Sequence, residues 1–316
     1  MKKFLQKLAI FLLMLILILW TGQTLVDIRI KNRTVNGHDN LDIVKGQHND
    51  MVFMGSSRCL SHFDPSLFEK ALKIKAMNLG VDGHSELSMQ ILRLRDYLQK
   101  NSSPRFVVLN FDPLVSAGSM EKNENFVHKN SFARYAYSHS KVNEPFVRYF
   151  DFNFAERHIP LYALLRYKLL LDCISLSNID NWVTNGYEKH DEQWDTIAHP
   201  INRNLVSYYF DTSASTLRTI GIGLDSLNSL CIQHNCRLIC VQSPIYKAVY
   251  DKTHYGLTAN LCKTLAIPFF DLNNEEIDNN IDNFYNIDHL NTRGVNEMAA
   301  TLLADPGFLN VVRGKD

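Results

Sequence analysis

A serine near the start of the chain and a histidine near its end are the residues best suited to chemistry. Ser57 follows the apolar run 51–54 at a Gly-Ser-Ser turn, and His289 lies just before a predicted helix at 292–303. A hydroxyl is a poor nucleophile until a base removes its proton, and histidine is the usual base at neutral pH. An isolated Gly-Ser-Ser is more often a simple turn with a helix cap. The nucleophile hypothesis therefore depends on the segments around it.

Two further polar segments close apolar runs. The segment 78–83, Asn-Leu-Gly-Val-Asp-Gly, ends the run that begins at Ile74, and the segment 110–112, Asn-Phe-Asp, follows the run 106–109. Short apolar runs of this kind are typical of buried parallel strands. The carboxyl ends of parallel strands meet at one edge of the sheet, where α/β proteins place their chemistry. We therefore expect both segments to converge with the Gly-Ser-Ser turn.

Strand and helix patterns alternate through most of the chain, which predicts an α/β fold with a mostly parallel sheet and right-handed crossovers. Asp64 followed by Pro65 is a typical helix start, and Thr292 is the expected cap of the last helix. The predicted strands cover 51–54, 74–79, 106–109, 237–241 and 268–270, and the predicted helices cover 65–72, 85–99, 215–235, 257–265 and 292–303.

An insertion of roughly 100 residues, 114–213, interrupts this alternation. It is rich in Tyr, His, Asn and Asp and has one clear helical stretch, 161–171. Loops of this length in compact domains are usually functional. We expect the insertion to form either a lid over the strand ends or a docking surface.

The amino-terminal segment 4–20 is almost wholly apolar and follows Lys2 and Lys3. Basic residues before an apolar run favour a cytoplasmic amino terminus with the rest of the chain translocated. A cleaved signal peptide and a retained anchor both fit, but no small-x-small cleavage site follows Trp20, and the run through Val26 approaches the roughly 20 residues that span a bilayer. We favour a transmembrane signal-anchor at 1–26, a stalk at 27–50, and a single-pass protein of the inner (cytoplasmic) membrane with its C-terminal domain in the periplasm.

Charge and cysteine usage exclude several other classes. The 33 basic residues balance the 33 acidic ones and no basic block stands out, so nucleic-acid binding has little electrostatic support. The six cysteines show no CxxC pair, and the histidines show no HxxxH or HExxH spacing, so we expect neither a metal site nor a cofactor. Some cysteines could pair as disulfides in an extracytoplasmic domain.

Together these motifs resemble the SGNH (GDSL-type) hydrolase superfamily over residues 51–308. The shared features are a Gly-x-Ser turn after the first strand, Asn-x-Gly-x-x-Gly after the second, and a DxxH-like motif before the last helix. The resemblance implies a three-layer α/β/α sandwich with a flavodoxin-like sheet in a domain at 51–316, and esterase or acyltransferase activity. It further implies that Ser57 is the nucleophile, His289 the base and Gly83 the backbone oxyanion donor, with Gly80 a weaker candidate.

The chain departs from the family pattern beside the histidine. The position of the family's acid, three residues earlier, holds Asn286, while Asp288 is directly adjacent to His289. An adjacent residue rarely reaches its neighbour's Nδ1, so Asn286, a main-chain carbonyl, Asp282 or Asp288 remain alternative partners. Papain-like enzymes work with Cys-His-Asn, so an asparagine is compatible with activity.

A second departure is at the third strand, where Asn110-Phe111-Asp112 replaces the family's GxND motif. The amide of Asn110 could hold a developing oxyanion, a contribution of about 3 to 4 kcal/mol for such a donor, or Asn110 could simply form a strand-end turn. Asp112 could not do so while ionised, and we expect it to pair with the planar guanidinium of Arg58.

Two functions follow from this resemblance. With a Gly-Ser-Ser turn and a membrane anchor, the chain resembles extracytoplasmic SGNH-like proteins of alginate O-acetylation and cell-wall D-alanylation. Those proteins act beside membrane-bound O-acyltransferases. The first hypothesis is an enzyme acting on small acyl esters, chiefly acetyl, of cell-envelope carbohydrate, as a hydrolase or a transferase. The second is a catalytically inactive accessory protein that binds polysaccharide or a membrane-bound O-acyltransferase.

Overall fold

The computed structural model of the chain describes residues 1–32, 40, 43, 45–112, 131–137, 147, 149–174, 183–200, 213–249 and 252–314. The chain divides into two compact units. Unit 1 consists of Met1–Val35 and Asn123–Asn178, and unit 2 consists of Asn36–Lys122 and Ile179–Asp316. The interval 114–213 therefore contributes to both units, and much of it lies outside the described residues.

Unit 2 is built on a five-stranded sheet in the order β2-β1-β3-β6-β7 with every pair parallel. Counted along the sheet's own strands this is the order 2-1-3-4-5 of flavodoxin-like folds. It confirms the predicted α/β fold with a parallel sheet. The strands are β1 Met51–Met54, β2 Ala76–Asn78, β3 Phe106–Asn110, β6 Arg237–Gln242 and β7 Phe269–Asp271.

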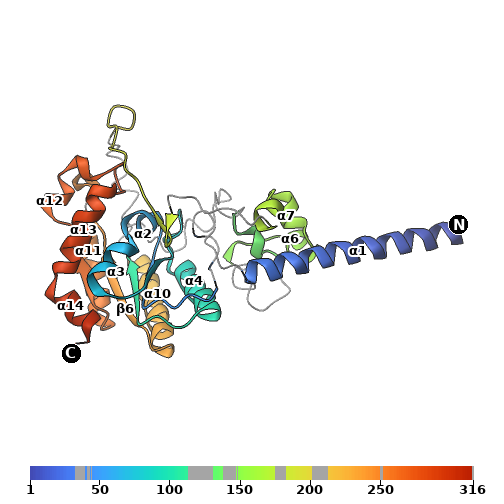
Figure 1. Cartoon of the computed structure of the whole chain (residues 1–316), viewed down its shortest axis with the longest axis horizontal. Coiled ribbons are helices and arrows are strands. Elements are labelled where there is room, and N and C mark those ends of the chain that lie inside the picture. The colour runs from blue at the N-terminus through green and yellow to red at the C-terminus, as the bar shows by residue number, and fades with distance from the viewer. Residues whose placement is uncertain are drawn as a thin grey trace. The chain divides into compact units, whose positions relative to one another are not determined.

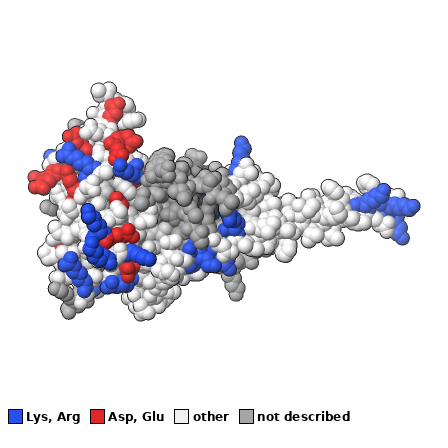
Figure 2. Space-filling model, viewed as in Figure 1, with Lys and Arg blue, Asp and Glu red and all other residues white. Residues whose placement is uncertain are grey.

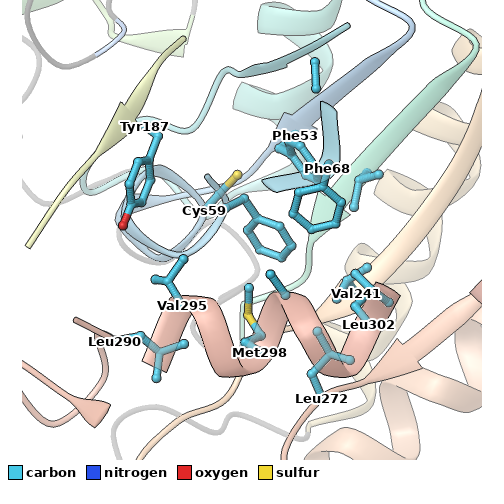
Figure 3. Close-up of a cluster of buried hydrophobic side chains, with 14 of the residues drawn as sticks. Phe53, Cys59, Phe68, Tyr187, Val241, Leu272, Leu290, Val295, Met298 and Leu302 are labelled. Atoms are coloured by element: carbon cyan, nitrogen blue, oxygen red, sulfur yellow. The ribbon is translucent and has the colours of Figure 1, made fainter. Parts of the chain in front are cut away.

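Helices cover both faces of this sheet, because its strands are apolar on both sides. Val52 and Met54 of β1 face a core shared with α4 (Leu87–Lys100), α10 (Ala214–Gln233) and α11 (Lys252–Thr264). Met51 and Phe53 face the opposite core, shared with α3 (Pro65–Leu72), α13 (Thr292–Ala304) and α14 (Pro306–Arg313). In Figure 3, Phe53 and Phe68 face the side of α13 that carries Met298. The expected three-layer α/β/α sandwich is therefore present.

Two helix starts in unit 2 can be compared with the predicted caps. Asp64 caps α3 with proline at its first turn, as predicted. Helix α13 is capped by Asn291, whose Oδ1 accepts the N–H groups of Arg293 and Gly294, so the expectation that Thr292 is the cap was wrong. A further helix, α14, follows it at the end of the chain. The remaining elements are α2 Ser57–His62, β4 Val183–Thr184, β5 Tyr187–Glu188, η5 Lys247–Val249, α12 Glu275–Asp278 and η6 Ile281–Asn283.

Unit 1 combines the long amino-terminal helix α1, Lys2–Lys31, with η3 (Ser131–Tyr135) and three short helices (Figure 1). The short helices are α6 Phe154–His158, α7 Tyr162–Arg166 and α8 Leu170–Ile174. The single helix expected at 161–171 is thus two helices, separated at Lys168, where φ is +60°. A non-glycine residue in this left-handed region does not continue a right-handed helix.

Helix α1 is the one helix among the described residues that is long and apolar enough to cross a membrane, a property that signal sequences share. Most of its apolar side chains between residues 4 and 20 are exposed, whereas Gln23, Val26 and Ile30 are buried. The helix therefore has a free amino-terminal part and a carboxyl-terminal part that belongs to the core of unit 1.

Candidate active site

The turn after β1 places two serines in different roles. Gly55 has φ of +152°, and a Cβ there would come within 2.7 Å of the Cβ of Cys59, so the tight turn into α2 requires glycine. Ser56 is the N-cap of α2: its Oγ accepts the N–H of Arg58 and donates to a carboxylate oxygen of Asp112. Ser57 is the first helical residue, and its hydroxyl is left to face the edge of the sheet.

His289 lies in the loop before α13, and its ring is beside Ser57 although the two residues are 232 positions apart. The His289 Nε2 atom is 2.8 Å from Ser57 Oγ. The other ring nitrogen, Nδ1, lies 3.0 Å from Oδ1 of Asn286 and 3.0 Å from Oδ1 of Asp288. If Ser57 donates its proton to Nε2, Nδ1 carries the ring hydrogen and donates to these oxygens. This is the geometry of a nucleophile, a base and an orienting group.

A turn built on Asn286 explains how an adjacent residue reaches the imidazole. The Asn286 Oδ1 accepts the main-chain N–H groups of Asp288 and His289, at 3.1 and 2.9 Å. This folds the loop back on itself and brings the Asp288 carboxylate alongside the ring. Asp282, another alternative partner, instead lies 3.6 Å from Arg293 and is half exposed. The two orienting candidates in the structure are therefore Asn286 and Asp288.

The charges in this loop favour the role of Asp288 over that of Asn286. Burial lowers the pKa of His289, but the charge of Asp288 and its hydrogen bond outweigh burial and raise that pKa above its usual value. Burial alone would raise the pKa of Asp288, whereas the His289 charge and hydrogen bond bring it below its usual value. Each group thus stabilises the charged form of the other. An imidazolium formed during proton transfer would be stabilised here.

Arg58 connects the loops that carry the serine and the histidine. Its guanidinium is buried and donates to Asp112 Oδ1 at 3.0 Å, as the sequence predicts. It also donates to the main-chain oxygen of Asp288 at 3.2 Å and to those of Ser243 and Pro244 at 2.6 and 3.0 Å. The Asp112 carboxylate accepts hydrogen bonds from both Arg58 and Ser56, so the Arg58–Asp112 ion pair holds the Ser57 turn in place. A planar guanidinium with five donors suits these simultaneous contacts.

His62 is a second buried side chain that supports the site. Its Nε2 accepts the main-chain N–H of Leu290 at 2.9 Å, and its Nδ1 lies 2.9 Å from Oγ of Ser243. An acceptor at Nε2 fixes the neutral tautomer with hydrogen on Nδ1. Burial, followed by the nearby charges of Arg58 and His289, lowers the pKa of His62 well below its usual value. The neutral ring therefore holds the loop immediately after the candidate base.

The three residues considered for the oxyanion differ in their surroundings. The Gly80 N–H already donates to Oδ1 of Asn78 at 2.8 Å, and a Cβ on Gly80 would collide with the main-chain nitrogen of Leu60. Gly83 is exposed in a turn with φ of +71°. Asn110 is buried and its Oδ1 accepts the Ser243 N–H at 3.1 Å, while its Nδ2 has no hydrogen-bond partner among the described residues. The Asn110 amide thus keeps donor capacity and the Gly80 N–H does not, while Gly83 is exposed to solvent.

Asn78 is a supporting residue whose role the sequence did not reveal. Its Nδ2 donates to the main-chain oxygens of Cys59 and Phe63 at 2.7 and 2.8 Å, and more distantly to that of Leu60. Carbonyl groups at the end of a helix lack intrahelical partners, so this amide caps the short helix that carries Ser57. The Asn-x-Gly spacing signalled the segment, but only the fold reveals which helix the asparagine caps.

Part of the insertion borders the site. The Asn185 oxygen, in the β4–β5 hairpin, accepts the Asn78 N–H at 2.8 Å. Further along, the His190 oxygen accepts the Thr292 N–H at 2.7 Å, and the His190 ring stacks on Tyr285 with centroids 4.0 Å apart. The Tyr285 ring is in turn 5.4 Å from the His289 ring. No sequence motif predicted these contacts of Asn185 and His190.

The described residues contain no group of three or more His, Cys, Asp or Glu side chains that could hold a metal ion. All six cysteines are free and buried, so none pairs as a disulfide in this structure.

Comparison with known proteins gives only distant likenesses. No family model matches the sequence, and no curated protein matches it. Among solved structures, one described as a "putative acylhydrolase" from Bacteroides fragilis has 15% identity and a TM-score of 0.38, covering 87% of this chain and 93% of its own. A "GDSL-like lipase" from Bacteroides thetaiotaomicron has 13% identity and a TM-score of 0.36, covering 84% of this chain and 88% of its own. At such scores these likenesses carry no functional argument, and the case for this chain's function comes from its own residues.

Proposed function

We propose that this chain is a serine ester hydrolase or O-acyltransferase of SGNH type. The observation that carries the proposal is the contact of 2.8 Å between Ser57 Oγ and His289 Nε2, with carboxylate and amide oxygens at the opposite ring nitrogen. A hydroxyl placed this way transfers its proton to the imidazole as it attacks an ester carbonyl. The motif pattern and the parallel sheet order agree with this reaction class.

The proposed reaction proceeds through an acyl-enzyme. Ser57 Oγ bonds to the carbonyl carbon and its proton moves to His289 Nε2, after which the imidazolium returns that proton to the leaving alcohol. The main-chain N–H groups of Ser57 and Gly83 and the amide of Asn110 are the candidate donors to the oxyanion. Water would complete a hydrolysis and a sugar hydroxyl a transfer. The substrate class we propose is a small acyl ester, chiefly acetyl, on cell-envelope carbohydrate.

We further propose that α1 is a retained anchor in the inner membrane, with unit 2 in the periplasm. The packing of its carboxyl-terminal part supports retention: the Gln23 Oε1 accepts the Leu161 N–H at 2.7 Å, and Val26 and Ile30 share a core with Leu164. Removal of the helix would expose this core to water. A membrane-bound O-acyltransferase is the partner that such an anchored enzyme would adjoin.

Reaction with a fluorophosphonate probe and hydrolysis of p-nitrophenyl acetate test the enzyme proposal. The full chain should be labelled at Ser57 and should release p-nitrophenol, while Ser57→Ala should do neither. Ser61→Ala is the matched control because it removes a serine from the same short helix. Equal rates of p-nitrophenol release for wild type and Ser57→Ala would refute the proposal. If the wild type alone is active, release of acetate from acetylated glycans tests the substrate class.

Two observations favour the alternative of a catalytically inactive accessory protein. The Gly80 N–H is consumed by Asn78, and the asparagine at position 286 stands where the family has an acid. In that case the probe would leave Ser57 unlabelled in the folded chain, and polysaccharide binding would be unaffected by Ser57→Ala.

A further inference from the structure

The three short helices of unit 1 leave a set of large apolar side chains in solvent. Phe154 and Leu171 are 76% and 73% exposed, although α6, which carries Phe154, is closed by a capping box at Asn153, and α8 buries Cys173. Surfaces of this kind mark sites of protein or membrane interaction when they cluster. We call the set the apolar collar; its members are Phe154, Ile159, Tyr162, Leu165, Leu171 and Ile174.

The collar lies at a defined height along α1. Leu161, beside the collar residue Tyr162, contacts this helix: its N–H donates to Gln23, and a Cβ on Gly22 would come within 2.9 Å of the Leu161 Cδ1. Further on, Cys173 of α8 packs with Val26 and Ile30. Helices α7 and α8 therefore lie alongside the part of α1 that runs from residues 22–23 to residue 30, and α6 packs on α7.

This height coincides with the outer boundary of the bilayer that α1 would span. No charged residue occurs from Leu8 to Val26. These 19 residues make a helix about 28 Å long, which matches a hydrocarbon core of about 30 Å. Trp20, half exposed, is an aromatic side chain of the kind found at membrane interfaces. With Lys7 at the inner boundary, the outer boundary falls near Val26.

The charge around the carboxyl-terminal end of α1 suits anionic headgroups. In the described part of unit 1 near this end, the exposed basic side chains are Arg29, Lys31, Lys168 and Arg166, of which Arg166 pairs with the buried Glu156 at 3.0 Å. The other acidic side chains are the exposed Asp151 and the half-buried Asp27, so basic groups remain in excess. On the face seen in Figure 2, blue side chains occur beside the base of α1, whereas the red ones gather elsewhere. Basic side chains at the membrane surface extend to the lipid phosphates while their methylene stems cover apolar surface.

We propose that the apolar collar is a membrane-seating surface that inserts into the headgroup region of the outer leaflet around the emerging anchor. The inference rests on the anchor part of the proposed function. The occupant we assign is the lipid bilayer, because the collar continues the apolar surface of α1 and is accompanied by basic side chains. The surface would restrain unit 1 at the membrane rather than leaving it to rotate on a single helix.

Fluorescence quenching in vesicles tests this. The full chain is reconstituted into phosphatidylethanolamine and phosphatidylglycerol vesicles, with an environment-sensitive probe attached to Leu171→Cys or to Phe154→Cys. The control is Ile232→Cys on α10, which is 65% exposed. Apolar side chains seated in an interface lie about 5 to 10 Å deep. We expect acyl-brominated lipids to quench both collar probes several-fold more than the control, and aqueous iodide to do the opposite.

Three outcomes would overturn the inference. Collar probes quenched like the control would place the collar in water. Collar probes shielded from both quenchers, with dimers formed by cross-linking at Leu171→Cys, would assign the surface to a second copy of the chain. Extraction of the chain by alkaline carbonate would refute the anchor and the collar together, whereas retention with water-exposed probes would refute the collar alone. Wild-type protein checks that the buried cysteines remain unlabelled.

Discussion

The contribution of Asp288 to the candidate base is the most direct test of the site. Asp288→Asn keeps the size of the side chain and removes its charge. The carboxylate lies 3.0 Å from Nδ1 of His289. A unit charge at that separation stabilises an imidazolium by about 5 kcal/mol at an effective dielectric constant of about 20.

Solvent reduces this figure, because the two side chains keep 13% and 16% of their surface exposed. We therefore expect a loss of about 3 kcal/mol in transition-state stabilisation, which lowers kcat about 100-fold. The introduced amide can also present its N–H to the ring and favour the wrong tautomer, the effect that costs about 10⁴ in a serine protease. The expected loss in kcat thus lies between about 100-fold and 10,000-fold.

The pH profile separates the charge effect from a loss of structure. The base works when neutral, and Asp288 raises its pKa, so wild-type activity should fall as the pH drops through a value above about 6.5. Without that carboxylate the pKa of His289 decreases, and the acid limb of kcat/KM should move to lower pH. The assay is hydrolysis of p-nitrophenyl acetate over the pH range, with Ser57→Ala as the baseline.

Asn286→Asp is the matched control, because it keeps an acceptor oxygen for the main-chain N–H groups of the loop. We expect this variant to remain active, with its acid limb unchanged or moved to higher pH. An unchanged kcat and an unchanged acid limb in Asp288→Asn would refute the reasoning. If Asn286→Ala then abolished activity, the orienting group would be the asparagine, as in papain-like enzymes.

The supporting residues give three further predictions. Arg58→Met should lower the free energy of unfolding by about 3 to 5 kcal/mol in urea denaturation, because it leaves buried Asp112 unpaired, and wild-type stability in this variant would contradict the network described here. Gly80→Ala should cost about 1 to 3 kcal/mol through its collision with Leu60, whereas Gly256→Ala, with open space around it, should be neutral or stabilising; equal thermal shifts would count against the close packing of Gly80. The lowered pKa of His62 should make stability fall as pH decreases below about 6.5, since the unfolded chain then binds a proton that the folded chain excludes, and His62→Gln should flatten the dependence of Tm on pH over that range.

The fold was predictable because its strands are short apolar runs that end in polar turns. Met51–Met54 and the run at 106–109 are buried on both faces, and such runs indicate parallel strands from composition alone. The helix at 161–171 was harder, because the left-handed Lys168 that divides it is set by packing and not by a glycine or proline. The cap at Asn291 was missed because Asn291 and the adjacent Thr292 are both suitable N-cap residues, and the sequence does not decide between them.

The site was predictable to the extent that chemistry depends on residue type. Ser57 and His289 were identified from their types and places, and the Arg58–Asp112 pair from opposite charge and the planar guanidinium, which suits a carboxylate. Asp288 was one of several alternative partners of His289, and the sequence could not select it, because the contact depends on the turn that the Asn286 side chain creates. Contacts that involve main-chain atoms, as at Asn78, leave no mark in the sequence.

The docking of the β4–β5 hairpin against Asn78 has a consequence for how the molecule is made. A Cβ at Gly186 would overlap the Asn78 main-chain oxygen, so this contact forms only when two stretches more than 100 positions apart meet without a side chain between them. Contacts between such distant stretches slow folding, because the chain loses the entropy of closing a large loop before the contacts can stabilise it. During synthesis, almost the entire polypeptide must emerge from the ribosome before the hydroxyl of Ser57, the candidate nucleophile, can meet His289. Prematurely terminated products should accordingly be inert.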